Sequence, residues 1–101
     1  MSVGINNRLR TIFNHYEERT QLVKLAEELH ELLREIYRIE CSHLIDADAQ
    51  PRGNDNFQGE LADVLVLCNQ FRLKYKKIDS IMDYKINRQI GRIKDEHTKP
   101  L

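Results

Sequence analysis

Residues 21–39 read QLVKLAEELHELLREIYRI, with apolar side chains at intervals of three and four residues, which is the period of an α-helix. Thr20 is suited to cap this helix, and the pattern predicts that the helix extends from Thr20 to about residue 43. A stripe of six apolar residues is expected to face the core: Leu22, Leu25, Leu29, Leu32, Ile36 and Ile39. No strand-like alternation of polar and apolar residues competes with the helical period in this chain.

The same spacing predicts three further helices. They are expected over about residues 4–16, from Asp55 or Asn56 to about Lys76, and from a Ser80 cap to about Lys94. Residues 45–55, which contain Pro51 and Gly53, are predicted to form a loop, and residues 77–79 a short turn. The inward positions of the last two helices are expected to be Leu61, Val64, Leu65, Cys68, Phe71 and Tyr75, then Ile81, Tyr84, Ile86, Ile90 and Ile93.

The predicted architecture is all-α. Short connections favour antiparallel neighbours, so we expect an antiparallel bundle of about four helices that forms a single domain over residues 1–101. A chain of 101 residues buries a modest fraction of its surface by itself, and we therefore expect a homo-oligomer, either a dimer or a tetramer, to complete the bundle.

The bulk composition narrows the function classes. Lysine and arginine number 16 and so do the acidic residues, which leaves no overall positive field for nucleic acid or an anionic membrane. The N-terminal MSVGINNRLR lacks the apolar core of a signal peptide, and no stretch approaches the length of a membrane span. Cys41 and Cys68 are far apart and form no CxxC motif, so reduced thiols are expected. These features predict a cytoplasmic protein.

Two acidic edges form the candidate site. At about 100° per residue, Glu28 and Glu31 lie on one flank of the apolar stripe of their helix. Glu60 and Asp63 lie on the same rotational flank of the next long helix. If the two helices pack face to face and antiparallel, all four carboxylates can converge beside one seam. Glu-rich helix faces are ordinarily solvated, and it is the matched spacing on two helices that favours a metal site.

Such a cluster is expected to bind a hard cation. Crowded carboxylates raise one another's pKa unless a cation neutralises them. Oxygen ligands with open coordination positions favour Mg²⁺, with Mn²⁺ as a possible substitute. A di-iron site is a rival, because Glu27–His30 and Glu40–His43 both show Glu-x-x-His spacing. Both pairs fall on one helix, about 20 Å apart, and cannot share one cluster within a chain.

The sequence resembles the MazG-like nucleotide pyrophosphohydrolases, whose signature is EExxE, a variable spacer, then ExxD. EELHE at residues 27–31 and ELAD at residues 60–63 match this signature, and QLVKLAEELHEL, FQGELADVLVL and HYEERTQ resemble its surroundings. The similarity spans about residues 11–93. The spacer between the two motifs is towards the long end for this family.

The resemblance implies hydrolysis of a nucleoside triphosphate between the α and β phosphates, giving the monophosphate and pyrophosphate. By this resemblance Glu28, Glu31, Glu60 and Asp63 would bind Mg²⁺, with Glu27 a weaker participant. A carboxylate, either Glu28 or Glu31, would accept the proton of the attacking water.

Other residues are assigned by the same resemblance. Lys85, Arg88 and Arg92 share one face of the fourth helix and would hold the leaving pyrophosphate, although a solvated basic face is the common fate of such a pattern. Family members tend to carry Lys-x-x-x-Asn here, and this chain does not. The residues expected to contact the base and sugar are His15, Tyr16 and Gln21.

Two alternatives remain open. One is a noncatalytic helical module that binds a partner or senses nucleotide. Such a module should tolerate neutralisation of the four acids, whereas a metal enzyme should lose its stabilisation by Mg²⁺. Nucleic-acid binding is the weaker alternative because the net charge is zero.

Overall fold

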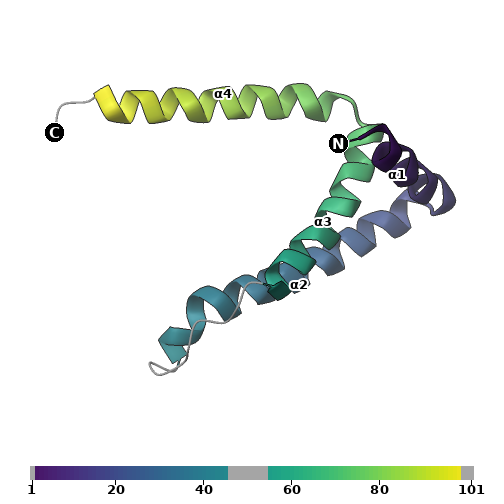
Figure 1. Ribbon diagram of the computed structural model, residues 1–101, viewed down its shortest axis with the longest axis horizontal. Helices are drawn as coiled ribbons and strands as arrows, with labels where there is room; N and C mark the ends of the chain where they lie inside the picture. The colour runs from purple at the N-terminus through teal and green to yellow at the C-terminus, as the bar shows by residue number, and fades with distance from the viewer. Residues whose placement is uncertain (1, 46–54, 99–101) are drawn as a thin grey trace. The chain divides into compact units, whose positions relative to one another are not determined.

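The computed structural model describes residues 2–45 and 55–98, with side chains described for residues 2–40 and 55–97. Within these residues the chain is all-helical, with four helices and no strand (Figure 1). The helices are α1 (Val3–His15), α2 (Glu18–Ile45), α3 (Asp55–Lys74) and α4 (Lys77–Thr98). The predicted all-α class and the four helices are thus confirmed. The predicted loop containing Pro51 and Gly53 lies outside the described residues, as does the side chain of Cys41.

The starts of α1 and α2 are marked by hydrogen bonds from backbone N–H groups of the first turn to the residue just before each helix. Ser2 caps α1 because its hydroxyl accepts a hydrogen bond from Ile5 N at 3.2 Å. Thr20 does not cap α2. Gln21 N already donates to Glu17 O at 3.1 Å, so the helix begins at Glu18, two residues earlier than predicted.

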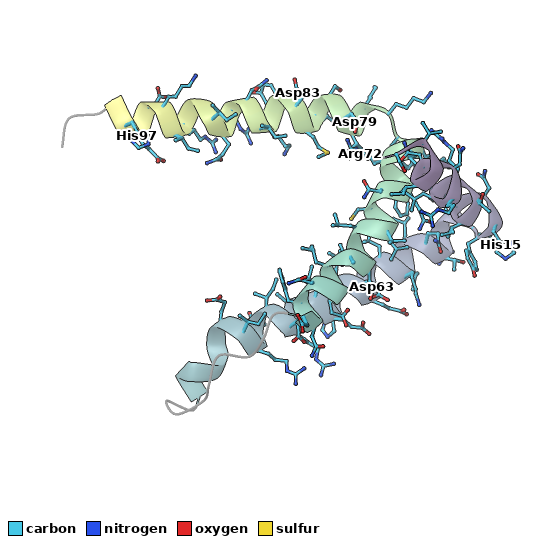
Figure 2. The ribbon with its side chains drawn as sticks, in the orientation of Figure 1. His15, Asp63, Arg72, Asp79, Asp83 and His97 are labelled. Carbon is cyan, nitrogen blue, oxygen red and sulfur yellow. The ribbon has the colours of Figure 1, made fainter. Side chains whose placement is uncertain are left out.

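The turn between α3 and α4 also differs from the prediction. It lies at Tyr75 and Lys76, where Ile78 N donates to Tyr75 O at 3.0 Å. Ser80 is therefore inside the first turn of α4, where its hydroxyl donates to Lys77 O at 2.9 Å instead of capping the helix. An ion pair between Arg72 and Asp79 spans this turn (Figure 2).

The chain divides into two compact units, Met1–Phe71 and Arg72–Leu101, and each is described by itself. The first unit contains α1, α2 and most of α3. Its buried apolar side chains are Leu9, Val64, Leu67 and Phe71, and the ring of Phe13 packs edge-to-face on Phe71 with centroids 5.3 Å apart. Because this core is small, the packing of the unit depends heavily on a few positions.

The packed face of α2 is rotated from the expected apolar stripe. Beyond Glu18 in the first turn, the buried and half-buried positions among the described side chains form one line: Gln21, Leu25, Glu28, Leu32, Glu35 and Ile39. Leu22, Leu29 and Ile36 are exposed, contrary to the prediction. The centre of the packed face thus lies about 50° from the expected centre, on the side of the acidic edge.

The packed face of α3 is rotated in the matching sense. Leu65 and Tyr75 were expected to face inward, and both are exposed. Glu60 is half-buried, on the same side of the helix as Phe71 and Val64. Both helices therefore turn their acidic edge inward and leave apolar side chains outside.

The second unit consists mainly of α4. Ile81, Tyr84, Ile86, Ile90 and Ile93, the predicted inward positions of this helix, are all exposed. The guanidinium of Arg88 lies over the Tyr84 ring, 5.7 Å from its centroid. Among the described residues, no helix combines the length and the apolar character needed to cross a membrane.

A matched pair of substitutions tests the rotated face of α3. Leu67 is 6% exposed and Leu65 is 48% exposed. We expect Leu67→Ala to lower the free energy of unfolding by about 2–5 kcal/mol because it leaves a cavity, and Leu65→Ala to lower it much less. Urea unfolding followed by circular dichroism measures both. Equal losses would contradict the assigned face.

Candidate metal and nucleotide site

Three carboxylates from two helices meet where the acidic edges face each other. Glu28 lies on α2, and Glu60 and Asp63 lie one turn apart on α3. One oxygen from each of the three lies within 4.8 Å of the other two. Figure 2 labels Asp63 where α3 lies along α2. The structure thus brings together three of the four acidic residues that the sequence singled out.

Glu28 and Glu60 each bury an oxygen that is left without a partner. The Oε2 atoms of both side chains are inaccessible to solvent and accept no hydrogen bond from the described residues. The Glu31 carboxylate is close enough to hydrogen-bond to either side chain, but only if one of the carboxyls carries a proton, because two ionised carboxylates have no donor. A buried carboxylate oxygen without a donor is costly. A cation between the two helices would remove that cost, because it supplies positive charge directly to both oxygens.

Burial and the closeness of the carboxylates raise the pKa of two groups in the cluster. Burial raises the pKa of the Glu28 carboxyl, the charges of Glu31 and Asp63 raise it further, and Lys24 partly offsets the rise. Burial likewise raises the pKa of Glu60, followed by repulsion from Glu31, Asp63 and Glu28. Glu31 therefore lies close enough to act on both groups, although its side chain is exposed at the edge of the cluster.

A cavity of about 460 Å³ adjoins the cluster and shares Glu28 and Asp63 with it. Ile12 and Tyr16 from the end of α1 and Val66 and Leu67 from α3 give the cavity an apolar wall and an aromatic ring. Its volume is within the range of small-ligand pockets. The remaining lining residues are polar: Thr20, Gln21, Lys24 and Gln70.

Two buried amides form part of the cavity wall. Gln21 Nε2 donates to Gln70 Oε1 at 2.8 Å, and Gln70 Nε2 donates to Val66 O at 3.1 Å. Gln21 was predicted to contact the base or sugar, whereas Gln70 was not predicted to have any role. The one sequence signal for Gln70 is its separation by seven residues from Asp63, which places both on one side of α3.

The other predicted ligand contacts differ in position. Tyr16 lines the cavity, and His15 is exposed and packs edge-to-face on the Tyr16 ring with centroids 4.7 Å apart. Lys24 also lines the cavity and is the cationic side chain among its lining residues. It lies one turn before Glu28 on α2.

Some predicted residues lie outside this cluster. Lys85, Arg88 and Arg92 lie on α4, are exposed, and belong to the second unit, so their role as a phosphate clamp stays a prediction. Glu27 and His30 are exposed on α2. The side chain of His43, which completes the second Glu-x-x-His pair, lies outside the described residues.

No protein-family model matches this chain, and neither the comparison with curated proteins nor that with solved structures finds a match.

The raised pKa values predict a pH-dependent stability. A carboxyl whose pKa is higher in the folded state stabilises the fold at low pH, and this contribution is lost as the pH rises through the folded-state pKa. Without divalent cations, Glu60→Gln should therefore become more stable than the unsubstituted protein, by a margin that grows as pH rises above the ordinary carboxyl range.

Urea unfolding in chelator at a series of pH values measures this margin. Glu17→Gln is the matched control, because it makes the same charge change at an exposed position outside the cluster. A Glu60→Gln margin that does not vary with pH would show that Glu60 is not electrostatically crowded in the folded protein.

Proposed function

We propose that the protein is a Mg²⁺-dependent nucleoside triphosphate pyrophosphohydrolase, which converts a (d)NTP and water to the (d)NMP and pyrophosphate. The observation that carries the proposal is the pair of unpartnered buried oxygens on Glu28 and Glu60, beside Asp63 and a ligand-sized cavity. The resemblance of the EELHE and ELAD motifs to the MazG-like family supports the same function.

The donor set fits Mg²⁺, and Mn²⁺ as a substitute. All the candidate ligand atoms are carboxylate oxygens, from Glu28, Glu60 and Asp63, with Glu31 at the edge. When held by Glu28, Glu60 and Asp63, such an ion would supply positive charge for a phosphate group and would activate a water as the nucleophile. This is the chemistry that hydrolysis of a phosphoanhydride needs from a metal.

The side chains divide the remaining tasks. Glu31 is the better placed of the two candidate bases because its carboxylate is exposed to water at the edge of the cluster, whereas Glu28 lies between the helices. The attacking water oxygen forms a bond to the α-phosphorus, and the bond from that phosphorus to the bridging oxygen breaks. The bridging oxygen departs with pyrophosphate.

Cations are needed to neutralise the triphosphate charge. Lys24 is adjacent to the cluster and would contact a phosphate oxygen. Lys85, Arg88 and Arg92 would hold the leaving pyrophosphate from one face of α4. In this proposal Tyr16 stacks on the base, and His15 supports the Tyr16 ring.

We also propose an antiparallel arrangement in a homo-oligomer. Gln21 and Glu28 on α2 pair with Gln70 and Glu60 on α3, so partners descend α3 as they ascend α2, which supports antiparallel packing. A second copy would cover a continuous apolar stripe on α2 that is exposed at Leu22, Leu29, Leu33, Ile36 and Tyr37.

The alternative is a noncatalytic interaction module in which the exposed apolar stripe of α2 binds a partner. Exposed apolar surface favours this alternative to some extent. It gives no reason, however, for turning Glu28 and Glu60 inward at a cost in burial. Both functions are compatible with the cytoplasmic location that the sequence predicts.

The activity is tested with purified protein and a panel of NTPs and dNTPs. We expect release of pyrophosphate with Mg²⁺ and none with chelator. Glu60→Gln and Asp63→Asn should lower turnover by more than the roughly 10- to 100-fold typical of outer-shell partners, with helicity retained. Glu17→Gln should keep normal turnover. Orthophosphate as the sole product, or full activity in Glu60→Gln, would refute the proposed reaction.

The oligomer is tested by sedimentation. A single chain has a mass of 12.0 kDa, and we expect a dimer or tetramer. Leu33→Glu should shift the population to the single chain, because it puts a charge into the exposed apolar stripe. Arg34→Glu, the next residue but on a different side of the helix, is the control and should leave the assembly intact. A single chain at all concentrations would contradict this part of the proposal.

A further inference from the structure

The buried amide pair has a fixed polarity. Val66 O can only accept a hydrogen bond, so Gln70 must turn its Nε2 towards that carbonyl. This leaves Gln70 Oε1 facing Gln21, which must then donate with its own Nε2. The orientation of both amides is thus set by one backbone carbonyl of α3.

Because both amides are buried, water cannot stabilise the opposite orientation of either one. Gln21 is 5% exposed and Gln70 is 2% exposed, so a flipped amide would place like groups against each other without solvent to compensate. The acceptor Oε1 of Gln21 makes no hydrogen bond to another described residue. The hydrogen bond to Gln70 uses only Nε2, so this oxygen remains as an acceptor on a residue that lines the cavity.

The cavity therefore combines a fixed acceptor with surfaces suited to a flat ring. Ile12, Val66 and Leu67 are apolar, and Tyr16 offers an aromatic face. A ring between these surfaces would satisfy Gln21 Oε1 only if its edge carried an N–H. A ring edge without an N–H would leave the acceptor dehydrated and unpaired.

We propose that Gln21 is a specificity-determining residue that selects ligands by an N–H donor on the edge of a nucleobase, and that Gln70 is the positioning residue that locks Gln21 in this role. The inference deepens the proposed function and rests on it for the identity of the ligand as a nucleotide. It does not depend on the carboxylate cluster, because Gln21 and Gln70 lie about two helical turns away from Glu28 and Asp63 along α2 and α3.

The binding test uses nucleoside 5′-monophosphates in chelator, so that neither metal nor turnover is needed. Three pairs of monophosphates differ at a single N–H-bearing position of the base. They are the 5′-monophosphates of adenosine and purine riboside, of cytidine and the pyrimidin-2-one riboside, and of uridine and 3-methyluridine. We expect the N–H-bearing member of at least one pair to bind at least about tenfold more tightly by calorimetry. Equal binding within every pair, or no binding of any monophosphate, would overturn the inference.

Substitutions of Gln70 test whether this residue fixes the orientation of the Gln21 amide. Gln70→Met removes both hydrogen bonds at similar side-chain volume and frees the Gln21 amide to rotate. The ratio of affinities for the nucleotides with and without the N–H should therefore fall towards one. Gln70→Glu in its protonated form offers a hydroxyl to Val66 O and a carbonyl to Gln21, and should keep most of the preference. A folded Gln70→Met protein with undiminished preference would overturn the positioning role.

Two further measurements separate this inference from the others. Side-chain amide signals in the NMR spectrum should show Gln21 protons exchanging slowly in the free protein and faster in Gln70→Met, and unchanged exchange would count against the lock. Glu60→Gln should keep the base preference while losing turnover. Base preference without pyrophosphate release in the unsubstituted protein would overturn the proposed reaction and leave the ligand-selecting role of Gln21 standing.

Discussion

The arrangement of the first unit depends on two carboxylates that face each other between helices. Glu28 and Glu60 are half-buried, and each has a buried oxygen without a hydrogen bond from the described residues. Burial, and after it the neighbouring carboxylates, raise the pKa of both groups. Apolar side chains in these places would be less costly. A fold that keeps the costlier residues at its centre is best explained by something that binds them, and a divalent cation is the simplest such ligand.

The sequence predicted the helices well and their facing sides poorly. Spacing alone identified four helices, but α2 begins at Glu18 and α4 at Lys77, a few residues before the expected caps Thr20 and Ser80. Periodicity could not choose the packed side of α2, because apolar residues cover more than one face of that helix. Leu29 and Ile36 fit a core stripe as well as Leu25 and Leu32 do, and only tertiary packing distinguishes them.

The sequence predicted the acidic residues of the candidate site but not Gln70, because spacing identifies only residues that form a recognisable pattern. Acidic residues at matched spacing on two helices stand out, so Glu28, Glu60 and Asp63 could be grouped before any coordinates. Gln70 could not, since a lone glutamine in a helix has no distinctive spacing and becomes informative only when it is seen buried against Gln21. The α4 cations were found by spacing, but spacing within one helix does not place them against another.

Polar groups occupy the inside of this unit and apolar groups much of its outside. Gln21, Glu28 and Glu35 are on the packed line of α2, whereas Leu22, Leu33 and Tyr37 are exposed on the same helix. The hydrophobic core of such a unit contributes little to its stability, because much of its apolar surface stays exposed instead of being buried. In the proposed function, further stability would come from binding a cation between the acidic edges and from covering the exposed stripe with an apolar surface. Both are binding events, so folding, assembly and the loading of the site would be coupled in one equilibrium.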